Sequence, residues 1–138
     1  MYTRKVQYYE TDKMGIVHHS NYIRWMEEAR MELFSEIGYD YAEVEKQGVI
    51  SPVVSVRCDY KKTVSFGETV TIDVFVKKIT AVKFIIGYEI YKEDGTLCTE
   101  GETSHCFITK SGKFVKLREE YADFYKKMQN LQRVEKTS

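Results

Sequence analysis

Apolar and polar residues alternate with a period of two along several stretches of the chain. In residues 69–77, for example, four apolar side chains occupy every second position. Such alternation is typical of antiparallel strands that bury one face in a core. A shorter alternation is expected to bury Val54, Val56 and Cys58 in the same way. With an Asp-Gly turn signal before the last of them, the pattern predicts five strands, over residues 4–9, 54–59, 69–77, 82–91 and 97–109.

Two stretches change to the helical period of three or four residues. Between residues 21 and 38, apolar positions fall on one face of a helix and most charged positions on the other. Ser20 or Asn21 is expected to cap the start of this helix, and Gly38 to end it in a left-handed conformation. A second helix is expected to begin near Glu119.

The expected elements follow one another as strand, long helix, four strands and terminal helix, with no internal repeat or linker. One curved sheet can bury the apolar stripe of a single long helix. We therefore predict an α+β fold in which a five-stranded antiparallel sheet wraps around a long central helix, with a C-terminal helix added. The length fits one domain over residues 1–138, and the polar residues 132–138 are expected to form a frayed tail.

Charge and composition argue against several classes of protein. Lys and Arg together number 21, as do Asp and Glu, so the chain has no basic excess with which to neutralise nucleic-acid phosphates. No apolar run approaches the roughly 20 residues that span a bilayer, and no apolar secretory segment follows the first residues. We therefore expect a cytoplasmic protein that binds neither nucleic acid nor membrane.

The cysteines and histidines give no metal-binding pattern. Cys58, Cys98 and Cys106 form no closely spaced pair, and each falls in an expected strand, where a reduced thiol behaves as a small apolar side chain. The vicinal His18 and His19 point in different directions in any regular structure. The sequence therefore predicts neither a metal site nor a cofactor.

The least regular stretch, residues 8–22, gathers chemically active side chains ahead of the long helix. It ends at a helix N-terminus, where unpaired N–H groups and the helix dipole favour negative charge, including an oxyanion. Asp12 in this stretch can serve as a nucleophile or as a general base on water. Taken alone, however, an aspartate before a helix is more often a turn or cap residue.

The motifs in this region resemble those of a known enzyme family. The chain is similar to hot-dog-fold acyl-CoA thioesterases, in the branch of the YbgC-like and 4-hydroxybenzoyl-CoA thioesterases. The likeness is carried by Tyr-Tyr-Glu-Thr-Asp at residues 8–12, Gly-Ile-Val-His-His-Ser-Asn-Tyr at residues 15–22, and Trp25, Glu28, Ala29 and Arg30. The resemblance implies hydrolysis of an acyl-CoA thioester to a free acid and CoA.

The resemblance also implies roles for single residues. Asp12 falls on the family's catalytic aspartate, and the backbone N–H of His19 falls on the donor that polarises the thioester carbonyl. The His19 side chain and Tyr8 match assisting residues, and Asn21 matches a polar position that helps to shape the pocket. Active sites of this family form between two subunits, so the resemblance implies a homodimer or homotetramer.

Other assignments stay open at this stage. Lys77, Lys78 and Lys83 are candidates for binding the phosphates of CoA, or they are solvent-facing strand residues that discourage edge pairing. The catalytic carboxylate could instead lie on the helix, at Glu27 or Glu28. The substrate could be a thioester of an acyl carrier protein, and a non-catalytic acyl-binding module is a further alternative.

Overall fold

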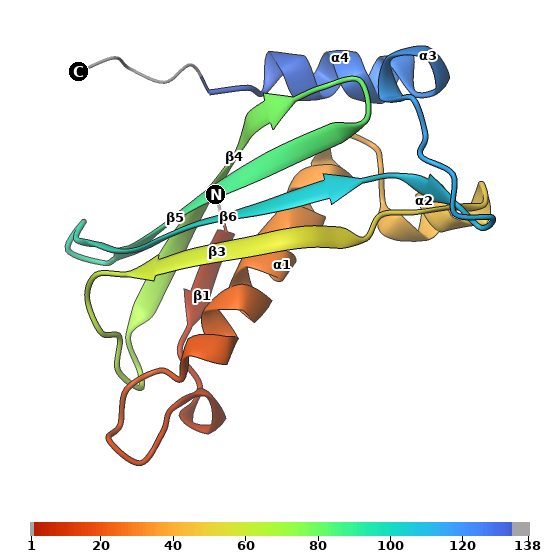
Figure 1. Cartoon of the computed structure of the whole chain (residues 1–138). Helices are drawn as coiled ribbons and strands as arrows, with labels where there is room; N and C mark the ends of the chain where they lie inside the picture. The colour runs from red at the N-terminus through yellow and green to blue at the C-terminus, as the bar shows by residue number, and fades with distance from the viewer. Residues whose placement is uncertain (1, 134–138) are drawn as a thin grey trace. The chain divides into compact units, whose positions relative to one another are not determined.

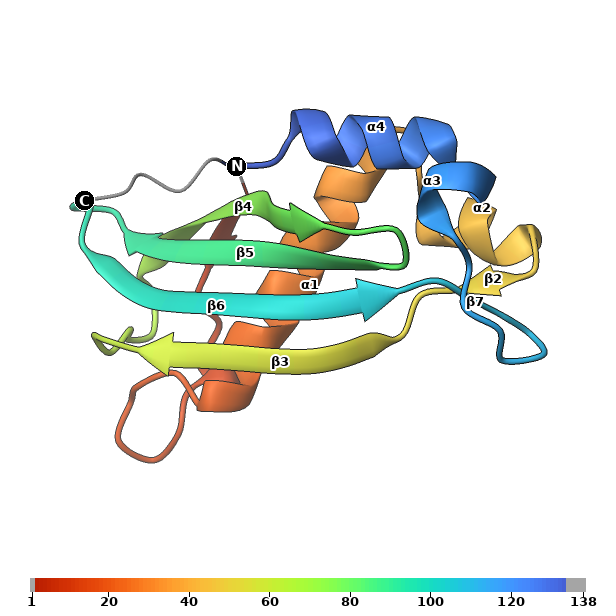
Figure 2. The ribbon, with the colours of Figure 1, turned by 45° about the horizontal axis from the view of Figure 1, so that its top comes forward.

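The protein, described over residues 2–133 by a computed structural model, is built on a five-stranded antiparallel sheet (Figure 1). The strands are β1 Tyr2–Lys5, β3 Val53–Tyr60, β4 Thr69–Ile79, β5 Lys83–Lys92 and β6 Leu97–Cys106. They lie in the order β1-β4-β5-β6-β3, of which the last four can be followed side by side in Figure 2. The predicted α+β class and the five-stranded antiparallel sheet are confirmed.

Helices account for most of the remaining regular structure in the described chain: η1 (a 3₁₀ helix) Tyr8–Glu10, α1 His19–Glu36, α2 Tyr41–Lys46, α3 Leu117–Glu120 and α4 Ala122–Asn130. The long helix ends as predicted, because Gly38 adopts a left-handed φ of 85° and the Tyr39 N–H donates to the Phe34 carbonyl over 2.8 Å. The C-terminal helix is confirmed as α3 and α4. None of the helices within residues 2–133 is long and apolar enough to cross a membrane.

The chain forms two compact units. Within residues 2–133, the first unit consists of residues 2–33, Arg57–Val74 and Tyr88–Gly101. The second consists of Phe34–Val56, Phe75–Gly87 and residues 102–133. The long helix and strands β3, β4, β5 and β6 contribute residues to both units.

In the first unit, the helix α1 approaches strand β6 closely. Trp25 and Met26 of α1 are fully buried. A Cβ atom on Gly101 of β6 would lie 2.6 Å from the Met26 sulfur and 3.1 Å from the Arg57 carbonyl oxygen. Because a side chain at this position would displace a neighbour, glycine sets the separation between helix and sheet.

In the second unit, an aromatic cluster forms the core. Its members are Phe34, Phe84, Phe107 and Phe124, with ring centroids 5.0 to 5.9 Å apart, mostly in edge-to-face contact. The cluster joins α1, β5 and α4 within this unit, which explains why a short amphipathic C-terminal helix is stable here.

The first strand is shorter than predicted. It ends at Lys5, and residues 8–10 form η1 instead of continuing the strand. The Glu10 carboxylate accepts a hydrogen bond from the Gln7 N–H over 2.8 Å, and the Thr11 N–H donates to the Tyr8 carbonyl over 3.1 Å. The hydrogen bonds of this local turn form in place of further strand pairing.

The last predicted strand, residues 97–109, is divided in the structure. Strand β6 ends at Cys106, and β7 (Ile108–Thr109) pairs with β2 (Val49–Ile50) in a separate two-stranded sheet. The elements β2 and α2 (Tyr41–Lys46) were not predicted from the sequence, because neither is long enough to show a period.

Strand β3 differs from expectation in its burial. Val54 and Val56 are 56% and 44% exposed, and Cys58 is only half-buried, so the prediction that this face enters the core of the single chain is wrong. The physical reason is the strand order, in which β3 lies at the edge of the sheet beside β6.

The beginning of the predicted frayed tail is ordered. The Arg133 N–H donates to the Val76 carbonyl over 2.8 Å, and the Arg133 guanidinium lies 3.6 Å from the centre of the Phe75 ring. Residues 134–138 of the predicted tail lie outside the described residues.

Candidate active site

A tightly bonded loop carries Asp12 toward the start of α1. The Asp12 N–H donates to the Ile16 carbonyl over 2.8 Å, and the Gly15 N–H donates back to the Asp12 carbonyl over 3.0 Å. Gly15 has a φ of 79°, which favours glycine at this turn. The Asp12 carboxylate accepts a hydrogen bond from the Met14 N–H over 2.8 Å. The loop is therefore an ordered turn in which Asp12 has a fixed backbone and an exposed side chain.

The helix α1 begins two residues earlier than predicted, and the cap is a different residue. His18 precedes the first helical residue, and its Nδ1 accepts a hydrogen bond from the Ser20 N–H over 3.3 Å. The His18 carbonyl accepts from the Asn21 N–H over 3.0 Å. The prediction that Ser20 or Asn21 caps the helix is therefore wrong, since His18 provides the acceptors. The N–H of His19 opens the helix and has no intrahelical partner by its position.

Asn21 fixes the loop onto the helix. Its side chain is buried, and its amide donates to the Glu10 carbonyl over 2.9 Å and more weakly to the His18 carbonyl over 3.4 Å. Its side-chain amide thus has a positional role, holding the segment from Glu10 to His18 against the first turn of α1.

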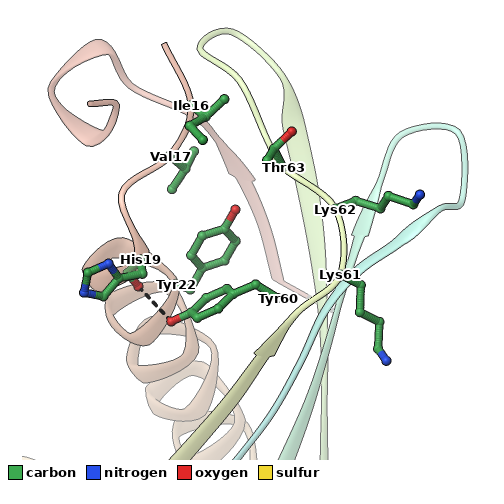
Figure 3. Close-up of a pocket in the computed structure, with 8 residues that line it drawn as sticks. All are labelled: Ile16, Val17, His19, Tyr22, Tyr60, Lys61, Lys62 and Thr63. Atoms are coloured by element: carbon green, nitrogen blue, oxygen red, sulfur yellow. Dashed lines mark hydrogen bonds between the residues drawn. The ribbon is translucent and has the colours of Figure 1, made fainter. Parts of the chain in front are cut away.

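A cavity of about 210 Å³ lies beside this first turn. It is lined by Ile16, Val17, His19, Tyr22, Tyr60, Lys61, Lys62 and Thr63. Figure 3 shows the rings of His19, Tyr22 and Tyr60 gathered at the helix start, with the side chains of Lys61 and Lys62 extending away from them. The wall is mostly apolar and aromatic, as is usual for a small-molecule pocket.

Tyr60 connects the end of β3 with the first turn of α1. Its hydroxyl donates to the His19 carbonyl over 3.3 Å, and its ring lies 5.0 Å from the Tyr22 ring. Burial, with the Cys58 thiol adding to it, raises the pKa of Tyr60 to about 12, and burial also raises the pKa of Tyr22. Both phenols are therefore neutral at physiological pH, where they can donate hydrogen bonds but not act as bases.

The four residues predicted to be catalytic are not all at this cavity. His19 lines it, whereas Asp12, Tyr8 and Asn21 are not among the lining residues. Asp12 is exposed, four and five positions before the lining residues Ile16 and Val17. Tyr8 is 77% exposed, with its ring edge against Phe66.

The lysines predicted for CoA binding belong to the second unit, whereas the cavity belongs to the first. Lys77 pairs with Glu102 over 3.1 Å, and Lys78 and Lys83 are exposed.

Sequence reasoning missed the two lysines that line the cavity. The N–H groups of Lys61 and Lys62 both donate to the Cys98 carbonyl, over 2.8 and 3.1 Å, which is the pattern of a β-bulge. The available signal was a pair of lysines close behind the strand predicted over residues 54–59.

The two carboxylates of the helix that were considered as alternatives, Glu27 and Glu28, do not line the cavity. Glu28 accepts hydrogen bonds from Arg4 at both oxygens, over 3.0 and 3.1 Å, and from the Tyr2 hydroxyl. Glu27 is exposed, and neither carboxylate lines the cavity.

The three cysteines lie in strands, as the sequence predicted. All three cysteines are free, and burial raises the pKa of each thiol, which disfavours the nucleophilic thiolate. Within residues 2–133, no group of three or more His, Cys, Asp or Glu side chains is arranged to hold a metal ion.

A five-stranded antiparallel sheet with one long helix is the architecture of hot-dog-fold proteins. Residues 6–129 match the family model described as the thioesterase-like superfamily. The chain belongs to this superfamily, so the family and the hot-dog fold predicted from the sequence are confirmed.

Individual relatives agree with this membership. The chain is 38% identical over 122 residues to "Putative acyl-CoA thioesterase YneP" of Bacillus subtilis, covering 88% of each protein. It is 26% identical over 116 residues to a 1,4-dihydroxy-2-naphthoyl-CoA hydrolase of Prochlorococcus marinus, covering 80% of this chain and 77% of the relative. The crystal structure of a DHNA-CoA thioesterase from Staphylococcus aureus superposes with a TM-score of 0.87 at 37% identity, covering 94% and 90% of the two chains.

Proposed function

We propose that the protein hydrolyses acyl-CoA thioesters, with Asp12 as nucleophile or general base and the N-terminus of α1 at His19 polarising the carbonyl. The observation that carries the proposal is the cavity beside the first turn of α1, where the N–H of His19 opens the helix. Membership of the thioesterase-like superfamily supports the reaction class.

The reaction needs little from the protein beyond these groups. The oxygen of water adds to the thioester carbonyl carbon, the carbon–sulfur bond breaks, and the thiolate of CoA leaves and takes up a proton. A helix N–H directed at the developing oxyanion is worth about 3–4 kcal/mol of barrier. In the alternative route, Asp12 attacks first and water then hydrolyses the mixed anhydride, which gives the same products.

We propose an aromatic acyl group as the substrate class. Three rings, from His19, Tyr22 and Tyr60, line the cavity, and such rings favour contact with a flat apolar group. The naphthoyl-CoA named for the Prochlorococcus relative supports the same class.

The experiment that tests the function is release of thiol from a panel of acyl thioesters. Aromatic acyl-CoA, short aliphatic acyl-CoA and acyl-carrier-protein thioesters are compared, and the highest kcat/KM is expected for an aromatic acyl-CoA. Binding of these compounds without thiol release would instead identify an acyl-binding module. A preference for the carrier-protein thioesters would instead identify an acyl-carrier-protein thioester as the substrate.

The same assay separates two candidate sets of CoA-binding lysines. We propose that Lys61 and Lys62 contact the CoA phosphates, because they lie at the cavity and their side chains extend away from its aromatic end. Replacing both by alanine is expected to raise KM for acyl-CoA by about two- to fivefold per lysine, and to leave KM unchanged for an acyl-pantetheine without the nucleotide. The matched control replaces Lys78 and Lys83. A rise in KM for acyl-CoA confined to that control would favour the original candidates of the second unit.

We further propose that two copies of the chain pair through β3 and complete the site that Asp12 serves. The strand lies at the sheet edge, and its exposed Val54 and Val56 form an apolar stripe that a second copy would cover. An intersubunit site would also account for an exposed Asp12 that does not line the cavity of one chain.

A charged side chain on this edge should prevent pairing. Light scattering at micromolar concentration is expected to show a dimer or tetramer for the unmodified protein and a smaller species for Val56→Lys, with a parallel loss of thiol release. Val82→Lys is the control, since Val82 is also an exposed valine, at 39%, but lies outside β3. A stable monomer that is fully active would contradict the proposal.

A further inference from the structure

The backbone of His18 is held from two sides. Its N–H donates to the Glu10 carbonyl over 2.9 Å, and its own carbonyl accepts from the Asn21 backbone N–H over 3.0 Å. The Asn21 side-chain amide reaches the carbonyls of both Glu10 and His18. His18 therefore has little freedom to rotate away from the first turn of α1.

The His18 side chain acts on the same turn. Its Nδ1 accepts the Ser20 N–H over 3.3 Å and lies 2.9 Å from the Ser20 hydroxyl. A nitrogen that accepts an N–H bond carries no hydrogen, so the contact assigns the proton of the neutral ring to Nε2. The ring lies against that of His19, with centroids 4.2 Å apart.

We propose that His18 is a positioning residue for thioester hydrolysis, whose unprotonated Nδ1 caps α1 and thereby fixes the direction of the neighbouring His19 N–H. The inference rests on the proposed function. Its basis is that the Ser20 and Asn21 N–H groups are both taken by His18, while the His19 N–H opens the helix beside the cavity. A helix whose first turn loses its cap frays, and the first N–H group then loses its fixed direction.

The test compares His18→Ala with His18→Asn. Asparagine supplies an uncharged oxygen acceptor and is among the best N-cap residues. His18→Ala is expected to lower kcat for an aromatic acyl-CoA by about five- to tenfold with KM within about twofold, and His18→Asn to restore most of kcat. Lys13→Ala, an exposed substitution in the preceding loop, is the control and should leave kcat unchanged.

A second measurement does not depend on activity. Amide hydrogen exchange at Ser20 should be faster in His18→Ala than in the unmodified protein, and slow again in His18→Asn. Unchanged kcat in His18→Ala, or asparagine no better than alanine in both assays, would overturn the proposal. Absence of thiol release from the unmodified protein, with the exchange pattern as expected, would instead refute the proposed hydrolysis while leaving the cap in place.

Discussion

Asp12→Asn is expected to lower kcat for acyl-CoA hydrolysis by about a hundred- to ten-thousandfold, the usual contribution of a catalytic acid or base. The substituted amide is neutral and can neither attack the carbonyl nor take a proton from water. Its oxygen can still accept the Met14 N–H that now bonds the carboxylate. Because the residue is exposed, the free energy of unfolding should change by no more than about 0.5 kcal/mol. Steady-state thiol release and urea denaturation measure the two quantities.

The chain offers a matched control at Asp94. Its carboxylate is also exposed in a turn and accepts the N–H two residues ahead, that of Thr96, over 2.9 Å. Hydrogen bonding to Thr96 lowers the pKa of Asp94, so this carboxylate is ionised at neutral pH. Asp94→Asn should leave kcat unaltered. Near-normal turnover in Asp12→Asn together with a large loss in Glu28→Gln would instead assign the reaction to the helix carboxylate.

The elements predictable from the sequence were those whose burial repeats with a period. Strands β4 and β5 and the helix α1 each bury one face. Apolar side chains therefore recur every two residues in the strands and every three to four residues in the helix. Gly38 could be foreseen as the end of α1, because a left-handed residue is needed there and glycine adopts that conformation most readily.

Interactions between distant residues were not predictable in the same way. The alternation of Val54 and Val56 indicates an apolar face but does not say whether its cover comes from the same chain. The bulge that places Lys61 and Lys62 at the cavity depends on the Cys98 carbonyl, which is far away in sequence. A motif likewise identifies Asp12, whereas the exposure of its side chain follows only from the folded loop.

At Glu10, a turn forms where the local sequence predicts a strand. Residues 4–9 have enough apolar and aromatic character to predict a strand, yet the strand ends at Lys5. The Glu10 side chain is directed inward, where it meets three donors, and this arrangement replaces the strand pairing. A glutamate is rarely buried, so only knowledge of its partners could have predicted the turn.

Because of those partners, the loss of the Glu10 side chain should strongly destabilise the fold. Glu10 is only 2% exposed. Its carboxylate accepts hydrogen bonds from the Trp25 indole N–H over 2.7 Å, the Gln7 N–H over 2.8 Å and the Arg4 guanidinium over 3.1 Å. Glu10→Ala leaves a partly buried cation and two N–H donors without this acceptor. We therefore expect the free energy of unfolding to fall by about 3–5 kcal/mol, measured by urea denaturation.

Comparison with Glu28→Ala isolates the effect of burial on stability. Glu28 pairs with the same Arg4 as Glu10, but its side chain is more exposed. The Glu28 side chain is 34% exposed against 3% for Glu10, and water can replace it as a partner of Arg4. Its loss should cost about 1 kcal/mol or less. An equal loss of unfolding free energy in the two variants would mean that pairing with the charge of Arg4, and not the buried N–H donors, accounts for most of the effect of Glu10. The Glu10 side chain fixes the turn whose backbone carbonyl accepts the His18 N–H, so Glu10→Ala should loosen the start of α1 and lower kcat even where the protein remains folded.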